Sequence, residues 1–588
     1  DPDNDDEDLI LGGDIRVAAG SEVHSGGGTI GLLAGSIAFA NTGDSTGGSV
    51  FLDGLLDSGG GGVTLEAMRS LSISERETHN FGGLIQIGQD AVIETNGGQV
   101  DIRSQTDPAA TTLHDGKTTV RIFGEIDTRV YDPDTTLLDL DEEGGEIDIL
   151  SDGSFGRVEL NYLRGDTDPM FASNGGDVSI LSNGSTTIVQ GTIDTRFAGS
   201  VLPDEDEIAG EIEIASVSLT SLQAVAGNGI RLLADSKLEL TAGLDGVQDL
   251  RFDTQNGTIT LGADAIELRA RNGLGSFSTS QVDFSSADSG LQLTNAAGDA
   301  NPLELLIGQD AAIGSDNLPD ADQFIDGVID VEKLTLQSFD HDIQLANIAI
   351  TVSDELTLSA REGIAIDQAT TSLNVGSSLN LEVYDAFTVD DALAMAINNA
   401  APEINITAGA LDTIANLGEA GLTIDAAVLS AGDSLLLHAG AGGAGDLSFE
   451  NDPTLMANEI TLWAGDGSSL SDTPQVVAVD PDDGSDRVAF TLSGGARAFT
   501  LRQSASISDD TIPNASQFNG GIAGPCVRTR ARSVARTRST PPSSGTRSSR
   551  STRATESISI SIPEWGTAHS RCAAWTSAAS NPSPTPAP

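Results

Sequence analysis

Short units of the pattern apolar–polar–apolar recur along most of this chain, and a glycine-rich turn precedes many of them. After paired glycines the unit appears as Gly97-Gly98-Gln-Val-Asp-Ile, Gly144-Gly145-Glu-Ile-Asp-Ile-Leu and Gly175-Gly176-Asp-Val-Ser-Ile-Leu, with Ala209-Gly210-Glu-Ile-Glu-Ile as a degenerate copy. Copies without paired glycines lie at residues 15–17, 71–73, 158–160, 238–240, 259–261, 266–268, 356–358, 379–381, 404–406, 422–424 and 460–462. Period-two alternation places Val, Ile and Leu on one face of a strand and polar residues on the other. The pattern therefore predicts many strands of about three to five residues each.

The corners between these strands favour a narrow stack of coils. Glycine and asparagine tolerate the left-handed backbone that a sharp bend requires, and asparagine recurs at such places: Asn96, Asn174, Asn183, Asn228, Asn256 and Asn272. Long helical patterns are nearly absent, the best being residues 390–399, and aromatic residues make up only 4%. Small aliphatic side chains that stack from coil to coil suit such a narrow interior. We therefore predict an all-β fold, a parallel β-helix or β-solenoid over residues 9–524.

Irregular spacing of the repeat leaves one alternative fold open. The paired glycines are separated unequally, from Gly97 to Gly144 to Gly175. This irregularity also fits an array of small β-sandwich domains. In the β-helix, the extra residues at 132–134 and 203–206 are expected to be loop excursions from the coil.

The two terminal segments differ from the repeat region. Residues 1–8, DPDNDDED, form an acidic stub. From Pro525 to Pro588 the chain holds nine arginines and two glutamates, a net charge of +7, whereas residues 1–524 hold 20 basic and 86 acidic residues, a net charge of −66. The repeat pattern stops near Gly524. The basic, Ser/Arg/Pro-rich tail at 525–588 is therefore predicted to be disordered or translated out of frame, and a basic arm for anionic partners is the other interpretation.

Charge and composition exclude several classes of protein. The 588-residue chain has a formal net charge of −59, which repels phosphate backbones, so we expect no nucleic-acid partner. Two cysteines, Cys526 and Cys572, cannot build a disulfide-rich scaffold or a multi-cysteine zinc site. No run approaches the roughly 18 apolar residues that a membrane helix needs, so we expect no membrane insertion of this segment. The chain starts at Asp1 without a leader sequence, as a mature product or an internal fragment would.

Polysaccharide hydrolases and lyases also use β-helices, but their side-chain patterns are not found in this sequence. Pectinase-type hydrolases combine clustered aspartates with Gly-His-Gly and Arg-x-Lys. None of the histidines lies between two glycines: His24, His79, His114, His341, His438 and His569. None of the lysines follows an arginine by two positions: Lys117, Lys237 and Lys333. Acidic pairs such as Asp390-Asp391 and Asp482-Asp483 fit a solvated surface, so we expect no catalytic residues.

Three further motifs imitate functional signatures. Gly43-Asp-Ser-Thr-Gly47 matches the G-x-S-x-G nucleophile elbow, but it lies between glycine-rich β segments, where a turn is expected. Gly442-Gly-Ala-Gly-Asp446 approaches the calcium-binding G-G-x-G-x-D repeat, but it occurs once and not in tandem. His341-Asp342 has only adjacent acids and no second ligand at zinc spacing. We expect no cofactor and no zinc site; weak, non-specific calcium binding and any other metal site stay open.

Two segments of the repeat region carry a family resemblance. GGDVSILSNGSTTIVQGTIDT (175–195) and GLTIDAAVLSAGDSLLLHAGAGG (421–443) resemble the repeats of filamentous haemagglutinin-like exoproteins, large bacterial surface adhesins of the two-partner secretion type. The resemblance covers most of residues 12–470. It implies a right-handed β-helical shaft that an outer-membrane two-partner transporter exports to the cell surface for adhesion and biofilm formation. It carries over no catalytic residues, and the Asn-Pro-Asn-Gly-type secretion motif of that family is not found near the start of the chain.

These observations together predict a non-enzymatic, adhesin-like shaft that is secreted or held on a bacterial cell surface. Its polar ladders of Ser, Thr, Asn, Asp and Glu would contact matrix polysaccharide or protein through many weak interactions. Two alternatives stay open. One is a polysaccharide-degrading β-helix enzyme, a lyase or a hydrolase. The other is a passive structural protein of a surface layer or biofilm.

Overall fold

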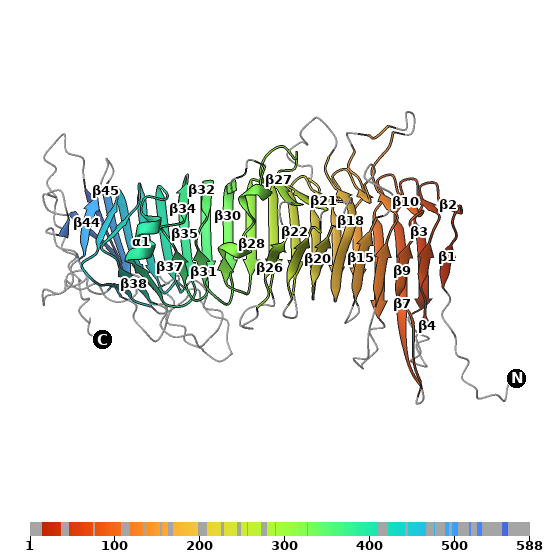
Figure 1. Cartoon of the computed structure of the whole chain (residues 1–588), viewed down its shortest axis with the longest axis horizontal. Helices are drawn as coiled ribbons and strands as arrows, with labels where there is room; N and C mark the ends of the chain where they lie inside the picture. The colour runs from red at the N-terminus through yellow and green to blue at the C-terminus, as the bar shows by residue number, and fades with distance from the viewer. Residues whose placement is uncertain are drawn as a thin grey trace, which may run out of the picture.

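The chain folds into a long stack of coils made of short parallel strands (Figure 1). The structure is a computed structural model. It describes residues 14–36, 46–74, 77–106, 118–132, 137–139, 142–152, 156–162, 169–197, 209–224, 229–243, 248–255, 257–271, 279–287, 290–325, 327, 329–409, 421–441, 445–465, 475–476, 488–492, 497–503, 517–518, 526–531 and 556–562. The stub at 1–8 and the loop residues 203–206 lie outside this set.

In the first part of the stack, each coil contributes one strand to each of three faces. The first face holds β1 (Ile15–Val17), β5 (Val50–Leu52), β9 (Leu84–Ile87), β12 (Thr119–Ile122), β15 (Arg157–Asn161), the start of β18 (Ser185–Asp194), β20 (Thr220–Gln223), β23 (Leu250–Asp253) and β26 (Val282–Ser286). The second face holds β2 (Glu22–His24), β6 (Leu55–Asp57), β10 (Val92–Glu94), β13 (Glu125–Asp127), β16 (Phe171–Ala172), the end of β18, β21 (Gly229–Leu233), β24 (Thr258–Gly262) and β27 (Leu291–Thr294).

The third face is the longest and continues through the whole stack. It holds β3 (Ile30–Ser36), β7 (Val63–Ser74), β11 (Val100–Thr106), β14 (Ile147–Ser151), β17 (Val178–Ser182), β19 (Ile212–Ser216), β22 (Lys237–Ala242), β25 (Ala265–Ala270), β28 (Glu304–Gln309), β30 (Ile329–Ser338), β32 (Ala349–Ala360), β35 (Ser378–Val383), β37 (Glu403–Ala408), β40 (Ser434–Ala439), β43 (Glu459–Ala464) and β45 (Arg497–Gln503). These strands belong to a 21-stranded sheet, whereas the first two faces join through β18 into a 17-stranded sheet.

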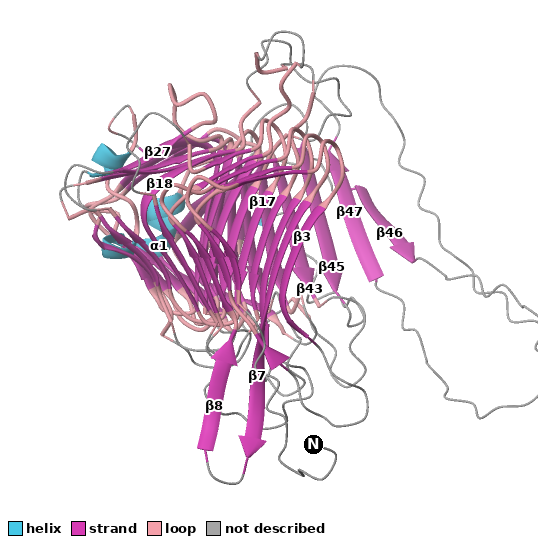
Figure 2. Cartoon of the chain, turned by 90° about the vertical axis from the view of Figure 1, so that its right-hand side faces the viewer, coloured by secondary structure: helices cyan, strands magenta, loops and turns pink. Residues whose placement is uncertain are grey.

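Strands of successive coils pair in parallel and in register, which confirms the β-helix. Val50, for example, pairs with Ile15 in the coil before it and with Ile85 in the coil after it. A β-sandwich array, whose sheets are antiparallel, is therefore wrong. Figure 2 views the stack from its N-terminal end. In that view the chain runs down along β7 on one side of the coil and back up on the other side toward β18 and β27. Because later coils lie farther from the viewer, the chain turns as a right-handed helix.

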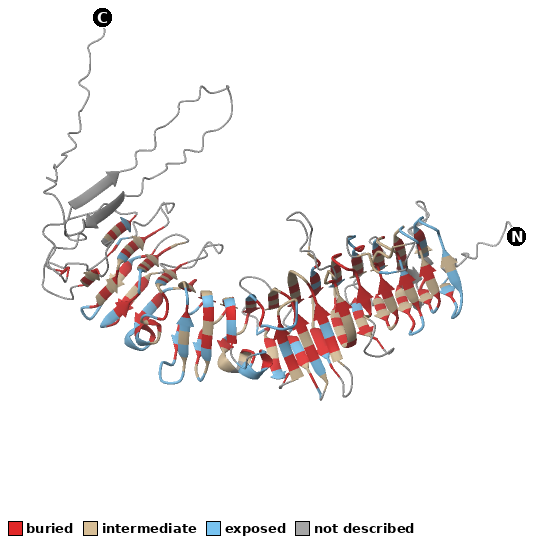
Figure 3. Ribbon diagram, turned by 90° about the horizontal axis from the view of Figure 1, so that it is seen from above, coloured by how far each residue is buried: buried red, intermediate tan, exposed pale blue. Residues whose placement is uncertain are grey.

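Columns of aliphatic side chains fill the inside of the coils. Leu52, Ile87, Ile122 and Leu160 occupy equivalent positions in four successive coils, and each is fully buried. Most outward residues beside them are polar, such as Gln86, Arg121 and Glu159, and burial alternates along the strands (Figure 3). The period-two pattern therefore does create a narrow aliphatic core, as the sequence predicts.

The second part of the stack, from residue 313 onwards, is less regular on its first two faces. Here the first face breaks into two three-stranded sheets: β29 (Ile313–Gly314), β31 (Ile343–Leu345) and β33 (Ile364–Ile366); then β36 (Phe387–Asp390), β38 (Leu422–Asp425) and β41 (Leu447–Phe449). The second face holds the starts of β30 and β32 with β34 (Ser372–Val375), and later a separate sheet of β39 (Val428–Ser430), β42 (Thr454–Ala457) and β44 (Ala489–Leu492). Two short 3₁₀ helices, Ser315–Asn317 and Ala321–Gln323, precede β30.

Between β36 and β37, a helix takes the place of the second-face strand. It is α1 (Asp391–Ile397), and the backbone N–H of Leu393 donates to the Asp390 side chain at 2.9 Å, so Asp390 is its N-cap. The helical pattern at residues 390–399 is thus confirmed. Leu393, Ala394 and Ile397 are buried, because they face the interior that a strand would otherwise close.

One predicted copy of the repeat is wrong. Residues 71–73 belong to the outer half of β7, which leaves the coil and pairs antiparallel with β8 (Glu77–Gly82) as a projecting hairpin (Figure 2). The short β4 (Thr46–Gly47) also pairs antiparallel, with the end of β3. Alternating residues suit a hairpin as well as a coil, so the pattern alone could not distinguish the two.

Two segments of the basic tail form strands beside the last coil. They are β46 (Cys526–Ala531) and β47 (Glu556–Ile562); β47 pairs antiparallel with both β45 and β46. The rest of the tail lies outside the described residues. The prediction of a disordered or out-of-frame tail is not tested by these strands.

Candidate binding surface

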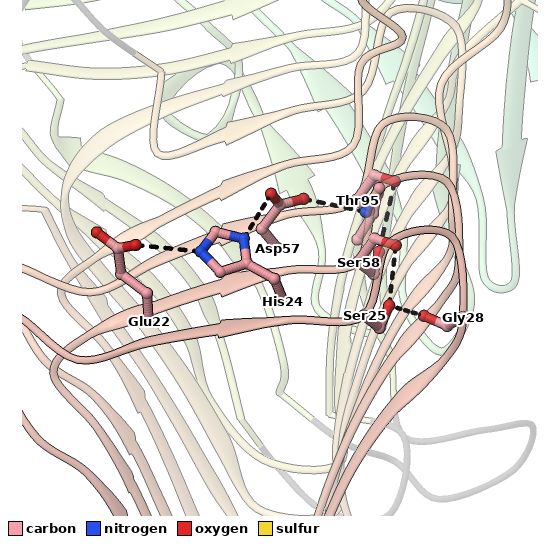
Figure 4. A network of polar contacts seen from close by, with 8 residues as sticks. Glu22, His24, Ser25, Gly28, Asp57, Ser58 and Thr95 are labelled. Atoms are coloured by element: carbon pink, nitrogen blue, oxygen red, sulfur yellow. Dashed lines mark hydrogen bonds and ion pairs between the residues drawn. The ribbon is translucent and has the colours of Figure 1, made fainter.

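A ladder of hydroxyl groups closes the corner between the second and third faces (Figure 4). The hydroxyl of Ser58 donates to the carbonyl of Gly61, three residues on, and lies 3.4 Å from the carbonyl of Thr95 in the next coil. Thr95 repeats the arrangement with the carbonyl of Gly98. Each hydroxyl thus satisfies a carbonyl that the sharp turn would leave without a partner. The corner ladder comprises Ser25, Ser58, Thr95, Thr128, Ser173 and Thr195.

The paired glycines of the repeat are required by the close approach of successive coils at this corner. A Cβ atom on Gly98 would lie 2.1 Å from the carbonyl oxygen of Gly61, and one on Gly145 would lie 2.2 Å from that of Gly98. Just before them, Asn96 and Asn174 have positive φ angles of 53° and 55°, as predicted for corner asparagines. Asn183 instead keeps a negative φ, and its amide donates to the Asp152 carbonyl at 2.7 Å.

A column of carboxylates precedes the corner ladder by one residue. Asp57, Glu94 and Asp127 are register partners in successive coils, where strands lie about 4.8 Å apart. His24 ends the column, with its Nδ1 2.9 Å from Asp57 and its Nε2 3.1 Å from Glu22. Hydrogen bonds to Glu22 and Asp57 raise the pKa of His24. Partial loss of hydration, and then the charges of Asp57 and Asp127, raise the pKa of Glu94.

Two coils carry the same Asp-Thr-Arg sequence at this corner, and there the chain makes an excursion before the glycines. Arg129 binds both carboxylate oxygens of Asp127, at 2.9 and 2.6 Å, and Arg196 binds those of Asp194 at 2.9 and 2.8 Å. The Thr128 hydroxyl reaches the Gly145 carbonyl at 2.6 Å across 17 residues instead of three. The repeated Asp-Thr-Arg was visible in the sequence, but its role in marking the excursions was missed.

The outer face of the third sheet forms an acidic surface in three successive coils. The acidic face comprises Glu146, Asp148, Asp177, Glu211 and Glu213 on β14, β17 and β19 and the residues just before them. Loss of hydration, and then the charge of Glu239, raise the pKa of Glu213. Cations flank the face in the neighbouring coils.

These flanking cations hold fixed positions. Arg103 lies 2.7 Å from Asp101 on one side of the acidic face. On the other side, Lys237 bridges Glu239 at 2.7 Å and Glu267 at 3.3 Å. The charge pattern therefore alternates along the shaft instead of being uniformly negative.

Two open hollows lie on the irregular part of the stack. One, of about 330 Å³, lies between β31, β33, β36 and α1, with Gln344, Ala365 and Thr388 among its lining residues. The other, of about 670 Å³, is lined by residues 347–349 and 368–372. Nothing in the sequence signalled either hollow, because each depends on how far two coils stand apart.

The acidic pair Asp390-Asp391 has structural roles. Asp390 caps α1, and Asp391 accepts a hydrogen bond from the Ala427 backbone N–H at 2.7 Å. Their carboxylates stabilise the helix and its neighbouring turn, roles that the expected solvated surface pair did not include. Asp482-Asp483 lies outside the described residues.

The other candidate motifs lie apart from one another in the fold. Of Gly43–Gly47, only Thr46 and Gly47 are described, and they form β4. Of the 442–446 motif, Asp446 is described and accepts a hydrogen bond from the Gln475 N–H at 2.8 Å. His341 lies 3.8 Å from Glu362. His438 stacks on the Trp463 ring at 4.0 Å between centroids.

The described part of the chain contains neither a cluster of metal ligands nor a helix that could span a membrane. There, no group of three or more His, Cys, Asp or Glu side chains is arranged to hold a metal ion. No helix among the same residues is long and apolar enough to span a membrane. The side chains of His79, His114 and His569 lie outside the part of the chain that the structure describes.

Comparison of the chain with protein families, with curated proteins and with solved structures finds no match in any of the three. The class that the fold defines is thus a parallel β-helical repeat protein.

Proposed function

We propose that this chain is a non-enzymatic, adhesin-like shaft, secreted or held on a bacterial cell surface, that contacts matrix polysaccharide or protein. The observation that supports the proposal is the in-register stacking of coils, which presents an outward polar face once per coil along the third sheet. A ligand with its own repeat can meet several of these faces at once. Weak contacts then combine through effective concentration, without any deep pocket.

The acidic charge fits this role in a second way. A net charge of −66 over residues 1–524 makes parallel shafts repel one another in solution. Divalent cations such as calcium would screen or bridge the carboxylates of neighbouring shafts. Surface location, adhesion, biofilm formation and export through an outer-membrane two-partner transporter rest on the resemblance to filamentous haemagglutinin-like exoproteins.

The direct test incubates the full 588-residue chain with a panel of immobilised acidic, neutral and amine-bearing polysaccharides. Retained protein and newly released polysaccharide chain ends are measured in the same tubes. Retention without new ends supports the binding shaft. New chain ends, saturated or unsaturated, would identify a hydrolase or a lyase instead, and the absence of both signals would favour a passive structural protein.

A charge variant tests whether the acidic face contributes to retention. The variant carries Asp148→Asn, Asp177→Asn, Glu211→Gln and Glu213→Gln, and we expect it to lose at least half of the retention on cationic or neutral polysaccharides. The matched control neutralises four exposed acids elsewhere: Asp320→Asn, Asp322→Asn, Glu332→Gln and Glu450→Gln. Both proteins lose the same charge, so a difference between them isolates the position of the carboxylates.

A further inference from the structure

The smaller hollow exists because two successive coils stay paired on the third face but not on the first. On the third face, β32 and β35 pair over six residues, from Glu355–Ser378 to Ala360–Val383. The two coils remain hydrogen-bonded just beyond these strands, where the N–H of Asp385 donates to the Arg361 carbonyl at 3.0 Å. Beyond Asp385 the coils diverge, since β33 ends one sheet and β36 begins another in this fully described stretch.

The helix α1 forms one wall of the resulting notch. It contacts β33, β36 and β39, and Ala392 and Leu393 line the hollow. The exposed Ala365 of β33 lies on the opposite side. Because this outward position carries only a methyl group, the space between the coils stays open.

The chemistry of the notch is rich in hydrogen-bond acceptors and negative charge. Asp367 and Asp390 both line it, and its lining among the described residues contains no Lys, Arg or His. The Asp390 carboxylate accepts one backbone hydrogen bond, and the Asp367 carboxylate accepts two, from the Ala369 N–H and the Thr370 hydroxyl. A carboxylate has about four acceptor positions, so each keeps capacity for a ligand. The Gln344 amide already donates to Asp342.

The larger hollow continues the same stretch of surface. It begins where the smaller one stops, because Ala346 and Asp367 line the first hollow and Asn347 and Gln368 line the second. Together they have the volume of sites that hold ligands of several rings. Aliphatic side chains such as Leu345 and Ile348 are also part of their linings, and these can contact the C–H faces of a sugar.

We propose that this notch is a binding site for a short, amine-bearing glycan segment, such as a few linked glucosamine units. Ammonium and hydroxyl donors of such a chain match the free acceptor capacity of Asp367, Asp390 and Thr388, whereas a uronate chain would be repelled. The inference rests on the proposed polysaccharide-binding function and gives it one location and one ligand class.

The test titrates a glucosamine tetrasaccharide into the full chain by calorimetry. Ala365→Arg places a long cation in the notch, and we expect at least tenfold weaker binding. Asp390→Asn keeps the helix cap, since Asn caps as well as Asp, and we expect about threefold weaker binding from the lost charge alone. The control Ala297→Arg adds the same cation at an exposed position after β27, away from the hollow, and should bind like the unaltered chain.

The same titration separates failure of the site from failure of the function. Circular dichroism melts must first show that all variants are folded. The proposed glycan site would be wrong if Ala365→Arg and the unaltered chain bound the glucosamine tetrasaccharide equally well. It would also be wrong if a galacturonate tetrasaccharide bound as tightly as the glucosamine one. If the panel of polysaccharides still retains the protein in that case, the binding shaft stands and only the site is wrong. A titration of the unaltered chain that released or absorbed no heat with the glucosamine tetrasaccharide would also refute the proposed glycan site.

Discussion

The first part of the stack, to about residue 294, and the second part, from residue 313, share one continuous sheet but differ at their corners. In the first part, six coils close the corner between the second and third faces with a buried or surface hydroxyl and glycines. In the next coils, Ala234 and Ala263 stand at the hydroxyl position. The stack then bends (Figure 3), its first two faces break up, and both hollows occur there.

This difference separates two kinds of surface. Identical corners hold successive coils at one spacing, which produces columns such as Asp57, Glu94 and Asp127. Varied corners let coils separate, and a separation creates room for a ligand. We therefore assign extended, weak contacts to the first part and the discrete glycan site to the second.

The largest expected effect comes from filling the tight corner. Gly98→Ala puts a Cβ atom 2.1 Å from the Gly61 carbonyl oxygen, so we expect a loss of about 3 kcal/mol. Because each coil contacts mainly its neighbours, amide hydrogen exchange should accelerate in β7 and β11 but not in β40 or β43. Gly308→Ala is the matched control, with no atom closer than 3.5 Å to its Cβ. Equal exchange in the two variants would refute the tight corner.

Removing one rung of the corner ladder should cost less. Thr95→Val keeps the shape of the fully buried side chain but leaves the Gly98 carbonyl without its hydroxyl donor. We expect a loss of about 1 to 2 kcal/mol, measured by hydrogen exchange in β10 and β11. Thr95→Ser retains the hydroxyl that Ser58 and Ser173 supply in other coils, so it should exchange more slowly than Thr95→Val. The reverse order would argue against a stabilising ladder.

Protonation of Glu94 should slightly raise the free energy of unfolding of the first part in acid, relative to its value near neutral pH. Its pKa is raised in the folded chain, so protonation favours folding; this stabilisation is present at low pH and lost as pH rises through the folded pKa. Glu94→Gln should thus be more stable than the unaltered chain at pH 7, with a difference that disappears at pH 3. Solvent exposure limits the gain to about 0.3 kcal/mol. Glu450→Gln, an exposed site in the second part, controls for the loss of one charge, and a gain that persists at pH 3 would contradict the charge column.

Calcium should stabilise the whole chain slightly. Weak binding to many carboxylates would raise the melting temperature, followed by far-ultraviolet circular dichroism, by about 1 to 2 °C in 10 mM calcium. Sodium chloride of equal ionic strength controls for screening. Equal melting temperatures in calcium and in sodium chloride would show that calcium does not stabilise the chain by binding to its carboxylates.

Much of the regular architecture could be predicted from the sequence, because it follows from local patterns. The Ile and Leu at residues 404–406 alternate with a polar residue, and they lie in β37 as expected. The paired glycines correctly predicted where the corners lie. Residues 71–73 show where the pattern fails, since a projecting hairpin uses the same alternation as a coil.

The site features were harder to predict, since they depend on distances between coils. The hydroxyl of Thr128 closes its corner with Gly145 only after a 17-residue excursion. No spacing rule links Ala365 to α1, although the helix itself was predicted from residues 390–399. A notch between coils is a property of their separation, and the sequence of one coil does not encode the position of the next.

The central claim is that this shaft binds polysaccharide without cleaving it. The most direct measurement applies the retention and chain-end assay to the full chain, the variant of the acidic face and Ala365→Arg side by side. The account predicts retention by the full chain, reduced retention by both variants on an amine-bearing polysaccharide, and no new chain ends in any tube. New chain ends, or retention that neither variant reduces, would contradict it.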